Sequence, residues 1–170
     1  MRLDRTRTEA SISMDACADI SVEHEFLKKV AMHRRKPMKG SPMSYYFAKT
    51  LSCGFDEAVQ RTTGALKAAG FGIISEIDVK ETLKKKIDVD FRPYRILGAC
   101  NPRMAYEALK IEDKVGTMLP CNVIVQDAGG GKIEVAAIDP VASMQAIGNP
   151  TLLETAKLVR SMLQSVVEGL

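Results

Sequence analysis

Cys100 occupies a position that favours a reactive thiol. It follows a predicted strand, and Asn101-Pro102 directly after it is typical of a helix start. A helix N-terminus carries unpaired N–H groups and a partial positive charge, and both stabilise a thiolate. The alternative is a small buried hydrophobic residue, which is how free cysteines usually behave in proteins. The sequence alone leaves both interpretations open.

Cys121 is the second candidate thiol, at the start of another predicted strand. If its strand runs parallel to the strand that ends at Cys100, the thiols lie at opposite ends of the sheet, about 20 Å apart. If the strands are antiparallel, the two cysteines meet and a dithiol becomes possible. No C-x-x-C pair occurs, and the only histidines are His24 and His33, outside the predicted domain. We therefore predict no metal site.

Arg92, Tyr94 and Arg95 lie shortly before Cys100 and suggest an anion site. A guanidinium group binds carboxylates or phosphates through two parallel hydrogen bonds, and an aromatic ring can stack on a ligand or on a cation. For Tyr94, packing at the edge of the core is an equal alternative.

The elements that must position these residues alternate between strand and helix patterns. Predicted strands cover residues 45–51, 71–77, 94–99, 121–126 and 133–138; predicted helices cover 56–69, 79–87, 102–111, 140–147 and 150 to the C-terminus. Asp56 is the expected cap of the first helix. Asn101, Asp139 and Asn149 each precede a proline, which is the usual chemistry of an N-cap. This order predicts an α+β fold, an α/β sandwich: a mixed sheet of about five strands, closed by a hairpin and followed by a long C-terminal helix.

Charge is distributed unevenly along the 170 residues. Residues 1–42 contain nine Lys/Arg and six Asp/Glu, whereas residues 43–170 contain fifteen of each. The second part therefore has no electrostatic footprint for nucleic acid. We place a domain boundary near Met43, with residues 1–42 as an N-terminal extension that holds a short helix and a basic linker. Residues 43–170 form a single predicted domain.

Composition excludes several broad classes of protein. Hydrophobic residues make up 46% and charged residues 26%, as in ordinary globular domains. The sequence contains no run of 18 apolar residues, so no membrane span is indicated. No secretory h-region is found, and the four cysteines lack the regular spacing of a disulfide framework. A cytoplasmic location with free thiols is therefore expected.

Three short blocks resemble one known family. They are DFRPYRILGACNP at residues 90–102, LPCNV at 119–123 and AIDP at 137–140, preceded by MSYYF at 43–47. In order and spacing they are similar to the family called domain of unknown function 302, over residues 43–170. The resemblance implies a small α/β protein that forms homodimers, with no agreed reaction or cofactor. The residues that match its motif positions are Arg92, Tyr94, Cys100, Asn101, Cys121 and Asn122.

Together these observations predict a homodimeric module that binds a small anionic or thiol-reactive molecule. Arg92, Tyr94, Arg95, Asn101 and Asn122 are the predicted ligand-binding residues. The alternative is a thiol-dependent redox or sulfur-transfer enzyme that uses Cys100 as nucleophile and Cys121 as the resolving thiol. A purely structural dimer is the third possibility, and whether any reaction is catalysed stays open.

Overall fold

The computed structural model describes residues 44–170. The strands are β1 (Tyr46–Leu51), β2 (Gly72–Asp78), β3 (Tyr94–Cys100), β4 (Cys121–Gly129) and β5 (Lys132–Ile138). The α-helices are α2 (Phe55–Ala68), α3 (Val79–Ile87), α4 (Pro102–Ile111), α5 (Pro140–Met144) and α6 (Pro150–Gly169), and two short 3-10 helices are η1 (Asp113–Met118) and η2 (Gln145–Ile147). The predicted helix and linker of residues 1–42 lie outside the described residues.

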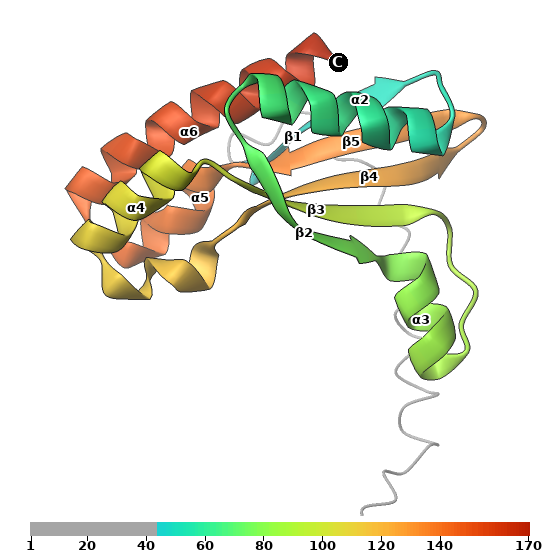
Figure 1. Cartoon of the computed structure of the whole chain (residues 1–170), viewed down its shortest axis with the longest axis horizontal. Coiled ribbons are helices and arrows are strands. Elements are labelled where there is room, and N and C mark those ends of the chain that lie inside the picture. Colours follow the sequence, from blue (N-terminus) through green and yellow to red (C-terminus); the bar gives the residue numbers. More distant parts are fainter. Residues whose placement is uncertain (1–43) are drawn as a thin grey trace, which may run out of the picture. The chain divides into compact units, whose positions relative to one another are not determined.

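The five strands form one sheet in the order β1-β5-β4-β3-β2. Every neighbouring pair is antiparallel, so the α+β class is confirmed but the expected mixed sheet is wrong. A strand-helix-strand order suggests parallel crossovers, which need the helix to return along a sheet face. Here α4 packs against α6 beyond the ends of β3 and β4 (Figure 1), so the chain turns back antiparallel instead.

Three of the predicted helix starts are confirmed by their capping hydrogen bonds. The side-chain oxygens of Asn101, Asp139 and Asn149 accept backbone N–H groups of α4, α5 and α6, at 2.9 to 3.3 Å. The predicted cap of the first helix is wrong. Helix α2 begins at Phe55 after Gly54, and Asp56 lies inside its first turn, where a carboxylate suits the helix dipole.

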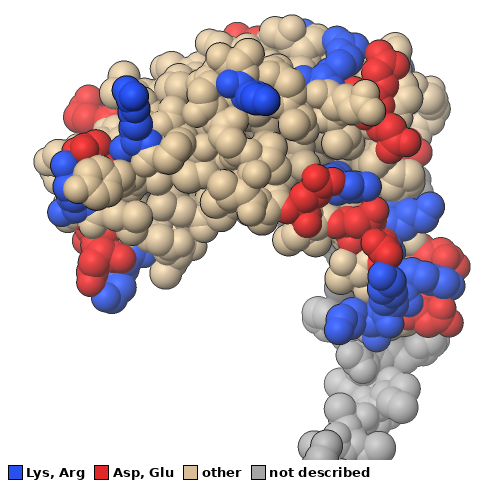
Figure 2. Space-filling model, in the orientation of Figure 1, with Lys and Arg blue, Asp and Glu red and all other residues tan. Residues whose placement is uncertain are grey.

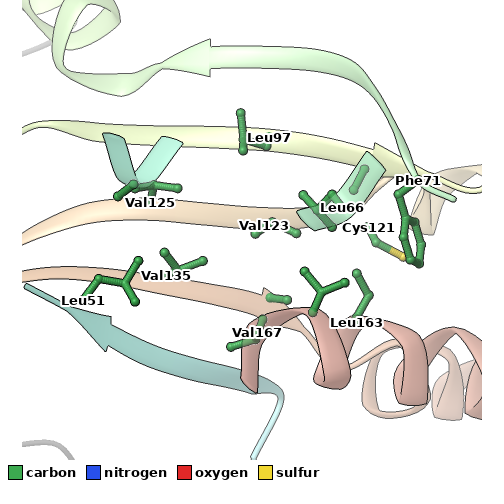
Figure 3. Close-up of a cluster of buried hydrophobic side chains, with 14 of the residues drawn as sticks. Leu51, Leu66, Phe71, Leu97, Cys121, Val123, Val125, Val135, Leu163 and Val167 are labelled. Atoms are coloured by element: carbon green, nitrogen blue, oxygen red, sulfur yellow. The ribbon is translucent and has the colours of Figure 1, made fainter. Parts of the chain in front are cut away.

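The core lies between one face of the sheet and the helices α2 and α6 (Figure 1). Figure 3 shows Leu66 of α2 and Leu163 and Val167 of α6 next to the side chains of the central strands. The fully buried strand residues are Leu97, Val123, Val125 and Val135. No helix among residues 44–170 is both long and apolar enough to cross a bilayer.

The other face of the sheet carries the alternate residues, because successive side chains of a strand point to opposite faces. We call it the open face and define it by these residues of the central strands: Tyr94, Ile96, Asn122, Ile124, Gln126, Glu134, Ala136 and Ile138. Their direct pairing across the strands confirms that they share one side: Tyr94 lies opposite Gln126, which lies opposite Glu134.

Gly98 is the position where the sheet tolerates no side chain. A Cβ atom there would lie 2.6 Å from Cγ of Pro120 and would also collide with Oγ of Ser75. We therefore expect Gly98→Ala to lower the free energy of unfolding by about 1–3 kcal/mol, as overpacking does. Urea denaturation measures this change.

Gly64 provides the matched control, since it lies inside α2 and a Cβ there meets nothing within 4 Å. Gly64→Ala should stabilise the protein by roughly 0.5–1 kcal/mol, because alanine is the better helix former. Equal stability of the Gly98→Ala variant and the wild type would contradict the close packing at Gly98.

Candidate functional site

A hollow of about 420 Å³ lies on the open face. Its floor is formed by β3, β4 and β5, and its rim by the chain before β1 and the chain before β3. The lining residues are Tyr45, Tyr46, Arg92, Tyr94, Asn122, Ile124, Gln126, Glu134, Ala136, Ala137 and Ile138. Tyrosines and aliphatic side chains thus surround a few polar groups, which is the usual composition of a small-molecule site.

The polar groups of the hollow form a chain of hydrogen bonds from the segment before β3 across β4 to β5. Arg92 donates from Nη2 and Nε to Oε1 of Gln126, at 2.6 and 3.2 Å. The amide of Gln126 in turn donates to Oε1 of Glu134 at 2.6 Å. The glutamine amide therefore separates the cation from the carboxylate and fixes the orientation of both.

Aromatic rings also hold the Arg92 guanidinium in place. Its Cζ lies 4.5 Å from the centre of the Phe91 ring and 5.5 Å from that of Tyr94. Partial burial raises the pKa of Tyr94, although the charge of Arg92 opposes this rise. The Tyr94 hydroxyl therefore stays protonated at neutral pH and remains a hydrogen-bond donor.

Arg95 does not belong to this group, although it was predicted with Arg92 and Tyr94. It contacts the carboxylates of Glu76 and Asp78, with Nη2 at 3.1 Å from Oδ2 of Asp78. One residue along a strand reverses the direction of the side chain, so Tyr94 and Arg95 point to opposite faces.

Charged side chains gather over α3 and around α4, with an uncharged region between them (Figure 2).

Cys100 and Cys121 lie at the same end of the sheet. Because β3 and β4 are antiparallel and Ala99 lies opposite Cys121, the antiparallel alternative is the correct one. Both cysteines line a small cavity between the strand ends and the helices α4, α5 and α6. Figure 3 shows the sulfur of Cys121 next to the ring of Phe71. Asn101 lines the same cavity and caps α4.

The surroundings of both thiols disfavour the thiolate form. Burial raises the pKa of Cys100 above its ordinary value. Burial, and secondarily the neighbouring Cys100, raise the pKa of Cys121 to about 11. At neutral pH both groups are therefore thiols rather than thiolates, which makes them poor nucleophiles. Among the described residues no three His, Cys, Asp or Glu side chains form a cluster.

The predicted residues thus divide between two places. Arg92, Tyr94 and Asn122 line the open-face hollow, whereas Cys100, Asn101 and Cys121 line the strand-end cavity. Gln126 and Glu134 were missed, although they connect the polar groups of the hollow. The available signal was their alternation with Val125 and Val135, which places polar residues on the face away from the core.

Comparison with known proteins gives a family match over most of the chain. The family model described as "Domain of unknown function DUF302" matches residues 47–170, which is most of the chain. The chain belongs to this family. None of the curated proteins compared with it matches.

A solved DUF302 structure has the same fold. It is described as the crystal structure of an uncharacterized conserved protein DUF302 from Bacillus stearothermophilus, and it is 28% identical to this chain. The match covers 74% of this chain and 98% of that protein, with a TM-score of 0.69. Membership of the DUF302 family therefore establishes the fold, and the function has to be argued from the sites.

Alkylation with iodoacetamide tests the state of Cys100. We expect the rate to rise with an inflection above 9.0, the ordinary value of the thiol pKa, because burial disfavours the thiolate. Mass spectrometry of the modified peptide identifies the site. Cys121 should remain unlabelled until the protein unfolds. The guanidinium-unfolded chain is the reference, and an inflection of Cys100 well below 9.0 would contradict the effect of burial and support the thiol-enzyme alternative.

Proposed function

We propose that this DUF302 domain binds a small organic molecule in the hollow of the open face. The observation that carries this proposal is the hydrogen-bonded series that runs from Arg92 at the rim to Gln126 and Glu134 on the floor of a hollow of about 420 Å³. The ligand has an acceptor group, such as a carboxylate, for the N–H groups of Arg92 that Gln126 does not use. At its other end it has a hydrogen-bond donor for Glu134.

The chemistry of the lining supports a ligand of this kind. Arg92 is held by Gln126 and by two aromatic rings before any ligand arrives, so little side-chain entropy is lost on binding. Glu134 repels a second negative charge near its carboxylate, which favours a monoanion or a zwitterion over a polyanion. Ile124 and Ala136 provide an apolar floor for the body of the ligand.

The binding experiment uses a panel of hydroxy acids, amino acids, and aromatic and aliphatic monocarboxylates. Binding is detected by a shift in melting temperature and measured by calorimetry. We expect Arg92→Met to weaken a hit by about tenfold or more, because a hydrogen bond to a charged group is worth about 1.5–3 kcal/mol. A panel without any hit contradicts the proposal.

Arg95→Met is the matched control, because Arg95 is an arginine three residues away whose side chain lies on the other face. This variant should keep the affinity of the wild type, even where the loss of its ion pairs lowers the melting temperature. Equal loss of affinity in both variants would indicate a general effect of charge rather than a site at Arg92.

We further propose that the domain forms a homodimer through the open face. One row of apolar residues crosses all five strands by direct pairing: Ala48, Ala136, Ile124, Ile96 and Ile77. Ile77, at the outer end of this row, is 46% exposed. A twofold contact brings the same patch of both subunits together, and an uncharged row matches itself without like-charge repulsion. The balanced charge of residues 43–170 adds no net repulsion between copies.

Sedimentation equilibrium tests the dimer. The wild type is expected to be dimeric, and Ile77→Lys to shift it to the monomer, because the contact would bury an unpaired charge. Ile77 lies outside the hollow, but Ile124 and Ala136 of the same row line it, so ligand affinity is also measured in the Ile77→Lys variant. Leu158→Lys, at a 60% exposed position on α6, should leave the dimer intact. A monomeric wild type, or dissociation by Leu158→Lys alone, would overturn this proposal.

A further inference from the structure

Four sulfur-bearing residues line the strand-end cavity. Cys100 and Cys121 come from the ends of β3 and β4, Met104 from the first turn of α4, and Met144 from the end of α5. Cys121 and Met144 are buried, whereas Cys100 and Met104 are half-buried. Thiolate and thioether groups are the ligands that soft metal ions select, and carboxylates or imidazoles are absent from this lining.

The size and polarity of the cavity restrict what it can hold. Its volume of about 30 Å³ is two to three times the roughly 10–15 Å³ that a cavity needs to hold one water. It is far below the roughly 300–1,000 Å³ of a typical pocket for an organic ligand. A buried water needs two to four polar partners, and apart from Asn101 and Thr155 the lining is apolar or sulfur-bearing. Asn101 already uses its side-chain oxygen to cap α4.

We propose that this cavity binds one soft monovalent metal ion of the copper(I) class through the Cys100 thiolate and the thioethers of Met104 and Met144, with the protonated thiol of Cys121 beside it. The S–H bond of Cys100 breaks, its proton goes to solvent, and a sulfur–metal bond forms without any change of oxidation state. One thiolate cancels the charge of a monovalent ion, so the cavity holds a neutral pair. A divalent ion would leave a net charge in apolar surroundings, which is costly.

The half-buried position of Cys100 gives the ion a way in. Cys100 also borders a shallow surface depression, together with Gly70, Gly72 and Pro102. One side of Cys100 therefore faces solvent, and the other side lines the cavity. The ion therefore meets Cys100 first and then the deeper Cys121 and Met144. This site does not depend on the proposed ligand of the open face, which involves different residues.

The first experiment uses silver(I) as a redox-stable probe of the full chain, with Cys17→Ser so that this thiol cannot compete. The methionine methyl groups are labelled with ¹³C and followed by NMR during titration of the reduced protein. We expect saturation at one equivalent, release of one proton, and shifts of the Met104 and Met144 methyl signals. Met118, which is 38% exposed and outside the cavity, should not shift.

The second experiment measures affinity by competition with the copper(I) chelator bicinchoninate. Met104→Leu and Met144→Leu conserve volume, so they should fold, and each is expected to weaken copper(I) binding by about tenfold or more, since even an outer-shell partner is worth about 10–100-fold. Cys53→Ser is the matched control, because Cys53 does not line the cavity. Zinc(II) should not compete.

Three results would overturn the proposal. The first is silver binding that leaves both the Met104 and Met144 signals unmoved, which would mean adventitious capture by an accessible thiol. The second is a loss of binding in the Cys53→Ser variant. The third is the absence of any binding at one equivalent, which would make the cavity a dry packing defect lined by sulfur. Each of these results leaves the test of the open-face hollow unaffected.

Discussion

The antiparallel ladder between β3 and β4 is the constraint on which both candidate sites depend. Its register places Ala99 opposite Cys121 at one end and Tyr94 opposite Gln126 at the other. A shift of this register by one residue would turn Leu97 and Val123 out of the core, so burial of the apolar face fixes it firmly. The two cysteines therefore lie at the same end of the sheet, and the polar residues of the hollow line up, as consequences of core packing.

The alternation of side chains along the strands then separates the core from the ligand chemistry. Val125 and Val135 are fully buried under the helices, whereas their neighbours Gln126 and Glu134 reach the open face and bond to each other. The same rule removes Arg95 from the hollow and leaves it with Glu76 and Asp78. Which side chains share a face of the sheet thus depends on their alternation along the strand rather than on their nearness in sequence.

Local signals in the sequence predicted local structure well. The Asn or Asp before a proline starts α4, α5 and α6 as expected, because an N-cap needs only one side-chain oxygen and the next few N–H groups. The direction of the strands was not predictable in the same way. It depends on where α4 packs, and α4 packs against α6, about 50 residues later in the chain. For the same reason the sequence left open whether Cys100 and Cys121 meet.

Two opposing effects act on the pKa of the Cys100 thiol: a helix dipole lowers it and burial raises it. Cys100 lies one residue before the N-cap Asn101, so it stands outside the first turn, and the Asn101 side chain already accepts the Met104 N–H. A helix dipole is worth about 0.3–1 kcal/mol, which is less than one pKa unit at about 1.36 kcal/mol. Desolvation shifts the pKa of a fully buried group by up to about 3–5 units. Here burial raises the pKa of half-buried Cys100, and it raises the pKa of buried Cys121 to about 11. The strand-end cavity therefore favours partners that displace a proton as they bind, as a soft metal ion does, over electrophiles that need a thiolate in advance.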